Sequence, residues 1–527
     1  MPPATLLNRA PSLRTTRHRL AAALLIALAP LAASAATIVV TSPDDSDTAA
    51  IDTCTLRQAI MSINIGGLIA ACHMSGAFGV DDTITFAASA ISGATTPGTV
   101  TLADSADTGG GLGGTLVISA ARLTIDGSEW RGDGDGQFPD GVTIARPTGA
   151  GHAFGILRST AAAGGELVLD GIALRNGRAL GDLCNGRSEG GGVCMVAANL
   201  TMTDSRVSGN SAGNGGGGIA AGGALTLTRC TIDENVAYLG GGVHVGAGGA
   251  FVTASHIDGN GAWAVSHGGG INADGPLQLL DSTISSNVAK RGAGIHSSGT
   301  LTLARSVVAG NQAYYDAGGI QIHAGTATVT GSTISHNFAR YNGAGLYVAG
   351  VLNATNSTIA GNSGYRNGGG IALYGSGILH LDHATLTQNG VGGTGGGISV
   401  VHLIPGMPPW TGSATIEHSI VSGNTQGSGT DIDAGIAWSG GGNLVSSADV
   451  ALGPLQDNGG PTPTMLPDPG SAAIDAIAPQ DCTQAADQRG VPRPWGTGCD
   501  IGAVEVVPDL IFADGFDGDA ASGLRKK

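Results

Sequence analysis

Paired carboxylates offer the first chemistry in this sequence. Asp233 and Asp258 each stand two residues before an asparagine that recurs about every 25 residues. If such repeats stack as parallel strands, the two carboxyl groups lie about 5 Å apart, the separation that a retaining glycosidase uses. The next repeats carry Ser285, Ala309 and Ser335 at this position, and the pair has no evident basic partner or third acid. Solvated turn acids are the favoured interpretation, and we predict no catalytic residue.

Metal ligands are the next candidates. Residues 126–136 (DGSEWRGDGDG) have the composition of a calcium loop but lack the terminal Glu at EF-hand spacing. An acidic loop without metal is favoured, so Ca²⁺ is only a weak cofactor hypothesis. Seven histidines are scattered over different repeat positions: His256, His267, His296, His323, His336, His380 and His383. We therefore expect no metal site, and His380 with His383 completes no ligand set.

Aromatic and basic residues recur three or four positions after the recurring asparagine. This set, the aromatic stripe, comprises Tyr238, Trp263, Lys290, Arg291, Tyr314, Tyr315, Arg340, Tyr341, Tyr365 and Arg366. Stacked repeats would expose these side chains on one turn, as a surface suited to acidic sugars or to a protein hot spot. The alternative is a ladder that stacks on itself and covers the turn. The ligand-binding hypothesis names Tyr238, Trp263, Arg291, Tyr314, Tyr341, Tyr365 and Arg366.

The recurring asparagine marks the register of the repeat. Nine repeats carry it, at Asn210, Asn235, Asn260, Asn287, Asn311, Asn337, Asn362, Asn389 and Asn424. An aliphatic residue stands three positions before each, a small residue stands five before, and Asn176 looks like an earlier member. We expect the asparagine to close a turn in the left-handed conformation and to bond to the next asparagine. Cys230 occupies the small-residue position, so we interpret it as an apolar filler.

Each repeat contains three stretches with strand periodicity. One alternates, as in residues 225–228 (LTLT), one surrounds the aliphatic before the asparagine, and one follows a glycine-rich turn such as residues 240–243 (GGGV). Strands this short must pair with their equivalents one repeat away, which gives three parallel sheets around an apolar interior. The predicted fold class is all-β: a single-stranded, right-handed parallel β-helix of about ten coils, capped at both ends.

Composition and charge indicate where the protein is located and restrict the classes of partner it can bind. Residues 1–35 carry four arginines, no acid, an apolar run over residues 20–31 and the sequence ASA at 33–35, which indicates a secretory signal peptide. The run is too short to span a bilayer, and no later segment is apolar enough. Without the signal, the net charge of −16 becomes about −20. This charge argues against nucleic acid or anionic lipid as the partner.

Six of the seven cysteines fall into pairs that are close in sequence. Export permits disulfides, so we expect three bridges, each closing a loop outside the regular repeats. The expected pairs are Cys54 with Cys72, Cys184 with Cys194, and Cys482 with Cys499.

The N-terminal segment and the repeats resemble parts of exported β-helix proteins. Residues 53–60 (TCTLRQAI) read as the start of a short amphipathic helix, and residues 81–86 (DDTITF) read as a strand. Together they resemble the CSLREA domain, with Thr55 in place of Ser and Gln58 in place of Glu. The repeats resemble the polymorphic outer-membrane protein type. These resemblances imply a pectate-lyase-like fold without implying lyase activity.

The C-terminal region resembles the choice-of-anchor Q domain. The resemblance rests on residues 455–464 (LQDNGGPTPT), 470–475 (GSAAID), 487–490 (DQRG) and 499–505 (CDIGAVE). Residues 511–516 (IFADGF) resemble a short tail shared by exported proteins of some Gram-negative bacteria.

These observations predict a domain order and a function. The order is a signal peptide (1–35), an N-terminal cap (36–114), the β-helix (115–450), a C-terminal cap (451–505) and a tail (506–527). We expect a non-catalytic protein, secreted or associated with the outer membrane of a Gram-negative bacterium, that binds an extracellular glycan or surface protein through the aromatic stripe, as an adhesin or matrix protein does. A polysaccharide lyase or hydrolase on the same fold, and a structural spacer, are the alternatives.

Overall fold

The computed structural model describes residues 35–45, 52–69, 71–79, 81–90, 98–104, 114–130, 141–181, 184, 186–262, 266–401, 410–426 and 431–507. Nearly all of the expected signal peptide and tail therefore lie outside the described residues. The same holds for Trp263 and for most of the acidic loop at residues 126–136.

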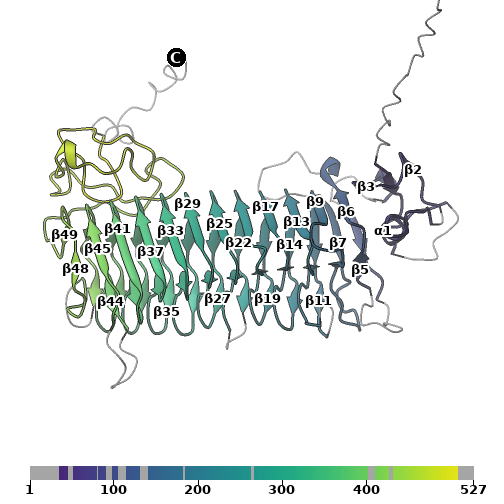
Figure 1. Ribbon diagram of the computed structural model, residues 1–527, viewed down its shortest axis with the longest axis horizontal. Helices are drawn as coiled ribbons and strands as arrows, with labels where there is room; N and C mark the ends of the chain where they lie inside the picture. The colour runs from purple at the N-terminus through teal and green to yellow at the C-terminus, as the bar shows by residue number, and fades with distance from the viewer. Residues whose placement is uncertain are drawn as a thin grey trace, which may run out of the picture. The chain divides into compact units, whose positions relative to one another are not determined.

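Each regular coil contains four short strands. In one coil these are β17 (Leu225–Thr228), β18 (Thr231–Asp233), β19 (Val236–Ala237) and β20 (Val243–Val245). Each strand pairs in parallel with its equivalent in the next coil, so that Leu227 pairs with Val252 and Ile232 pairs with Ile257. Figure 1 shows these coils stacked side by side. The all-β parallel β-helix predicted from the sequence is confirmed.

The described strands form four sheets, of 15, 13, 10 and 11 strands, where the sequence predicted three. The 10-stranded sheet is the unexpected one. Its members are two residues long and directly follow the ladder position, as in β15 (Ser211–Ala212) and β19. Two residues are too few to show an alternation of apolar and polar side chains, so hydrophobic periodicity could not reveal this sheet.

The 11-stranded sheet is the one that matters most for the candidate site. Its strands in chain order are β5 (Leu116–Ile118), β8 (Leu157–Ser159), β12 (Val193–Met195), β16 (Ile219–Ala221), β20, β24 (Ile271–Ala273), β28 (Ile295–Ser297), β32 (Ile320–Ile322), β36 (Leu346–Val348), β40 (Ile371–Leu373) and β44 (Ile398–Val400).

Aliphatic side chains fill the interior of the coils. Leu225 and Leu227 are buried, whereas Thr226 and Thr228 lie on the opposite face of β17, because side chains alternate along a strand. Each buried aliphatic contributes about 1.5–3 kcal/mol. A coil gains this stabilisation only between its neighbours, so the stack is stable as a unit and no coil stands alone.

The ladder asparagines are buried and bond from coil to coil. The backbone N–H and Nδ2 of Asn235 both donate to Oδ1 of Asn260 at 3.0 Å, and Nδ2 also donates to the carbonyl of Val207 at 2.8 Å. The pattern runs on to Asn424, which donates in the same way to Asp431. The predicted bonding between asparagines is therefore present.

Two details of the ladder differ from the expectation. The left-handed residue is the one before the asparagine, such as Glu234 with φ +56°. Asn176, expected to be an earlier ladder member, itself takes this left-handed position, with φ +63°. Gly177 is the residue whose N–H donates to Oδ1 of Asn210, at 2.8 Å. The ladder position in that coil is therefore occupied by glycine.

The N-terminal segment closes one end of the apolar interior. Strands β1 (Thr37–Val40) and β3 (Asp82–Phe86) pair in parallel at the start of the 15-stranded sheet, and β2 (Met74–Ser75) pairs antiparallel with β1. The helix α1 (Leu56–Ile65) begins with a capping box between Thr55 and Gln58. Its buried apolar residues belong to the same core as the coils. The helix and the strand expected from the sequence are both present.

Residues 450–507 contact the coils through polar side chains. Gln488 accepts a hydrogen bond from Thr358 Oγ1 at 2.7 Å and donates to Thr333 Oγ1 at 2.9 Å. Asn356 Nδ2 donates to the carbonyl of Ala486 at 2.8 Å. An ion pair between Arg493 and Glu505, at 3.0 Å, lies buried inside this segment. The DQRG motif thus fixes the segment to the coils.

All three expected disulfides are present: Cys54–Cys72, Cys184–Cys194 and Cys482–Cys499. Contrary to expectation, the loop that the second disulfide closes ends inside a regular repeat, because Cys194 belongs to β12 (Val193–Met195). Within the described part of the chain, no helix has the length and apolarity needed to cross a membrane.

Candidate ligand-binding face

The outer face of the 11-stranded sheet carries a row of polar and aromatic side chains. Each strand has three residues; the first and third point inward, mostly into the apolar core, and the second lies on the opposite face. Parallel register aligns the second residues of consecutive strands in a line. We call the part of this line from β20 to β36 the outer row: His244, Asn272, His296, Gln321 and Tyr347. Neighbouring members are about 4.8 Å apart, the spacing of paired strands.

The outer row is sheltered although it lies outside the core. Asn272, His296, Gln321 and Tyr347 each expose 8% of their surface or less. Several of the polar atoms are buried and have no hydrogen-bond partner among the residues that the structure describes: Nδ1 of His244, Nδ1 of His296 and Oε1 of Gln321. A buried polar group without a partner costs about 1–3 kcal/mol. These atoms are themselves covered by neighbouring residues, so a ligand would reach the row at its accessible edges, such as Asp274 and His323.

One flank of the outer row is formed by the residues just before the glycine-rich turns. Arg291 pairs with Asp316 at 3.3 Å, and Asp316 Oδ1 also accepts from Asn342 Nδ2 at 2.9 Å. His267, paired with Arg291 in the neighbouring coil, lies against His296, with 4.8 Å between ring centroids and 40° between ring planes. This flank fixes the ring of His296 from one side.

The other flank is formed by residues that follow the strands. The ring of His323 stacks on that of His296 at 5.7 Å, and the ring of Tyr374 lies 5.7 Å from that of Tyr347. Asp274 lies 3.5 Å from His244 and accepts a hydrogen bond from Asn272 at 3.4 Å. The outer row is thus held in place on both sides.

Burial disfavours the protonated form of two histidines of this face, His267 and His296. Burial first, and then the charges of His267 and His323, lower the pKa of His296 to about 3. Burial and the charge of Arg291 lower the pKa of His267. The hydrogen bond with His244 lowers the pKa of Asp274. A neutral imidazole offers one donor and one acceptor, which suits hydroxyl groups better than anions.

The aromatic stripe lies beside this face and forms a closed stack in its centre. Tyr315 and Tyr341 stack with 4.9 Å between ring centroids. Lys290 Nζ lies 4.7 Å from the Tyr315 ring, and the Arg366 guanidinium lies 4.5 Å from the Tyr341 ring. Each inner ring therefore has a ring on one face and a cation on the other. Arg291 joins the two surfaces, because it lies 5.6 Å from Tyr315 and also pairs with Asp316.

The structure brings only part of the ligand-binding hypothesis together. Tyr341, Arg366 and Arg291 belong to the closed stack, and Tyr365 contacts Phe338 edge to face at 5.4 Å. Tyr314 and Tyr238 are exposed at 47% and 37%, but no ring or cation contact joins them to the stack in the described chain. The self-stacking alternative thus accounts for the centre of the stripe, while its edges stay accessible.

The two candidate acids lie on adjacent strands, but each has a partner of its own. Asp233 in β18 and Asp258 in β22 (His256–Asp258) are in register. Arg206, the basic partner that sequence reasoning did not find, pairs with Asp233 at 2.6 Å. Ser285 Oγ donates to Asp258 at 2.6 Å. These contacts fit structural acids. In the acidic loop, the described Asp126 accepts the N–H of Ser128 at 2.8 Å.

Sequence reasoning missed the outer row as a set. Its members share no residue type, and three of them are not histidine. The usable signal was positional, because each stands one residue after the aliphatic that follows the glycine-rich turn, as His244 follows Val243.

Comparison with known proteins supports the fold. The family described as "Right handed beta helix region" matches residues 241–403, which agrees with the predicted right-handed β-helix. No match is found among curated proteins. Among solved structures, the pectate lyase Pel9A is similar with a TM-score of 0.34 and 11% identity, over 90% of this chain and 98% of that one. A likeness this weak carries no argument about activity.

Proposed function

We propose that the protein is a non-catalytic β-helix protein that binds an extended glycan along the outer row, with the aromatic stripe as the edge of the site. The observation that carries this proposal is the row of five polar and aromatic side chains that register aligns on one face, with the exposed Asp274 and His323 at its edge.

Spacing and charge support a glycan as the ligand. The row repeats about every 4.8 Å, so a polymer with repeated hydroxyl groups can meet several members in turn. Tyr238 and Tyr314 at the edge, exposed at 37% and 47%, add aromatic surface, and sugar rings pack on such surfaces. Arg291, Lys290 and Arg366 at the edge would favour acidic substituents on the sugar.

Catalysis is the weaker alternative for this face. A lyase or hydrolase needs carboxylates free to bind Ca²⁺ or to transfer protons. Asp274 interacts with His244 and Asn272, and Asp316 with Arg291 and Asn342. Incubation with polygalacturonate, alginate and hyaluronate, followed by absorbance of unsaturated uronates, tests the lyase alternative. A clear absorbance rise would contradict the non-catalytic proposal.

Binding is tested by a glycan array and by affinity electrophoresis in gels that contain polygalacturonate or alginate. We expect the mature protein to bind, and a His296→Ala, Gln321→Ala variant to lose at least tenfold in affinity. A Tyr238→Ala, Trp263→Ala, Tyr341→Ala variant tests the stripe and should lose less. His336→Ala, His380→Ala is the control, since both side chains are exposed away from the outer row.

The outcomes separate the three functions. Equal binding by the row variant and the control would refute the outer row as the site. Loss of glycan affinity only in the stripe variant would show that the aromatic stripe, and not the outer row, is the binding site. Absence of binding to every glycan would leave a protein ligand or a spacer, and would contradict the glycan proposal.

We further propose that the protein is exported and acts outside the cytoplasm. The three disulfides fit an extracellular protein. Support for export also comes from the signal-like residues 1–35 and from the resemblance of residues 36–114 to CSLREA domains and of 451–505 to choice-of-anchor Q domains. Cell fractionation with and without residues 506–527 tests whether the protein stays on the outer membrane, and recovery in the cytoplasm would contradict export.

A further inference from the structure

Two histidines occupy equivalent turns of consecutive coils beside the C-terminal segment. His383 follows β41 (Ile378–Asp382), and His418 follows β45 (Ala414–Glu417), which pairs with β41 in parallel. Both have φ +49° in the left-handed region. The two rings lie 4.8 Å apart. Register thus brings together histidines that are 35 residues apart in the sequence.

Both histidines face the same carboxylate oxygen. Asp382 Oδ1 lies 2.8 Å from Nδ1 of His383 and 3.5 Å from Nδ1 of His418. Thr483, from the C-terminal segment, places its Oγ1 3.2 Å from the same oxygen and 3.4 Å from Nδ1 of His383. Gln484 holds the other carboxylate oxygen with a hydrogen bond of 2.7 Å. Four potential ligand atoms therefore converge.

These separations resemble the edges of a metal coordination tetrahedron. Ligands about 2.0–2.1 Å from Zn²⁺ in tetrahedral geometry lie roughly 3.3 Å from one another. Nδ1 of His418, one of the four converging atoms, is buried and has no hydrogen-bond partner in the described part of the chain. Two imidazoles and one carboxylate are a ligand set suited to borderline divalent ions.

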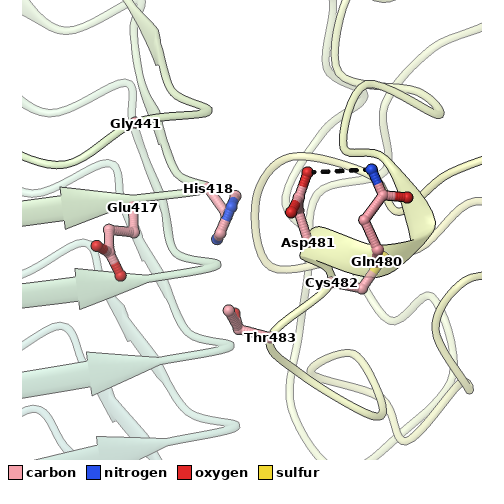
Figure 2. Close-up of a pocket in the computed structure, with 7 residues that line it drawn as sticks. All are labelled: Glu417, His418, Gly441, Gln480, Asp481, Cys482 and Thr483. Atoms are coloured by element: carbon pink, nitrogen blue, oxygen red, sulfur yellow. Dashed lines mark hydrogen bonds between the residues drawn. The ribbon is translucent and has the colours of Figure 1, made fainter.

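The site opens to a pocket through which an ion and water can enter. The pocket, about 430 Å³ in volume, is lined by His418 and Thr483 and by the carboxylates of Glu417 and Asp481, and none of its lining residues is cationic. Figure 2 shows His418 and Thr483 facing this space from opposite sides, one on the coils and the other on the C-terminal segment. Arg493, whose charge reaches His383, is neutralised by Glu505.

We propose that Asp382, His383 and His418 bind a divalent transition-metal ion of the Zn²⁺ class, with Thr483 Oγ1 or a water molecule from the pocket as the fourth ligand. The ion would join two coils to the C-terminal segment and would hold that segment in place. The site is separate from the outer row, so it does not depend on the glycan proposal.

The test uses the mature protein after EDTA treatment and dialysis. Calorimetry with Zn²⁺ should show one ion bound per chain at this site. Co²⁺ should give the d–d absorption of a tetrahedral nitrogen and oxygen site. Zn²⁺ should also slow hydrogen exchange over residues 479–499. His418→Gln and Asp382→Asn should each weaken binding at least tenfold.

His380→Gln is the matched control, because this exposed histidine lies on β41 only three residues from His383. His418 lies at the rim of the pocket, so its variant should fold, and circular dichroism checks this. Should His418→Gln nevertheless unfold, the Co²⁺ spectrum of the unaltered chain decides. Absence of Zn²⁺ binding, or of a tetrahedral Co²⁺ spectrum, would refute the site. Equal Zn²⁺ affinity in His418→Gln and His380→Gln would also refute it. The ion would then bind at another cluster, such as His267, His296 and His323.

Discussion

Tyr315 and Tyr341 lie on consecutive coils and stack face to face, with 4.9 Å between ring centroids and 23° between ring planes. Lys290 covers the outer face of the first ring and Arg366 covers that of the second. Both faces of each ring are thus in contact with other side chains of the protein. Only ring edges and hydroxyl groups are left to meet a ligand, so these residues act at the rim of the proposed site.

This stack should be measurable as a coupling energy. Tyr315→Leu and Tyr341→Leu in a double-mutant cycle should show coupling of about 0.5–1.5 kcal/mol, the range for aromatic pairs. Urea unfolding of the four proteins measures it. A cycle on Tyr238 and Tyr365, five coils apart, is the control and should give coupling near zero. Zero coupling between Tyr315 and Tyr341 would mean that the stack adds nothing to stability.

The asparagine ladder predicts a large cost for one substitution. Asn287→Ala removes the acceptor of two hydrogen bonds from Asn260, at 2.9 Å and 3.1 Å, and leaves both donors buried. At about 1–3 kcal/mol for each of the two unsatisfied groups, we expect the free energy of unfolding to fall by roughly 2–6 kcal/mol. Asn353→Ala is the control, since Asn353 is half-buried on the outward face of β37 (Val351–Thr355) and outside the ladder. Similar losses in both variants would contradict the special role of the ladder.

Gln488 should hold the C-terminal segment on the coils. Its side chain bonds to Thr333, Thr358 and Thr462, so Gln488→Ala leaves several buried hydroxyl groups without a partner. We expect faster hydrogen exchange over residues 451–505, with the coils before Thr333 unchanged. Gln480→Ala, at an exposed position, should leave exchange as it is. Uniformly faster exchange along the whole chain would show that the segment and the coils unfold together.

The stacked histidines predict a pH effect. The pKa of His296 is lowered to about 3, so the folded chain keeps it neutral while the unfolded chain protonates it near pH 6.5. The unfolded state then binds more protons, and stability falls as the pH drops from about 6.5 to 3, by up to about 1.4 kcal/mol per pH unit for this group. Urea unfolding at pH 7 and pH 5 should show a smaller loss for His296→Gln than for the unaltered chain. His336→Gln is the exposed control, and equal losses in all three would contradict the prediction.

The coil architecture could be predicted from the sequence because the residues that determine it are local. The aliphatic residue three before each asparagine and the glycine-rich turn after it recur in every repeat, as Ile232 and residues 240–242 show. The two-residue strands carry no such signal.

The candidate sites were harder to predict because they depend on register between coils. His383 and His418 both stand six residues before a ladder asparagine, but a longer coil places them 35 residues apart. The outer row mixes histidine, amide and tyrosine, so no residue-type pattern reveals it. Only the pairing of β24, β28, β32 and β36 makes its members neighbours.

Cys230 provides a test of the small-residue column beside the ladder. Its backbone N–H donates to Ser255 Oγ at 3.0 Å, and its thiol is buried near the carbonyls of Thr228 and Met202. Burial raises the pKa of this thiol to about 12, so little thiolate forms at neutral pH and alkylation requires unfolding. Iodoacetamide should label no thiol in the native protein and one per chain in urea with the disulfides intact. Cys230→Ser should change stability by less than about 1 kcal/mol, because serine fills this column in neighbouring coils and makes the same contacts. Rapid labelling of the native protein would show that the column opens, and that Cys230 is reactive after all.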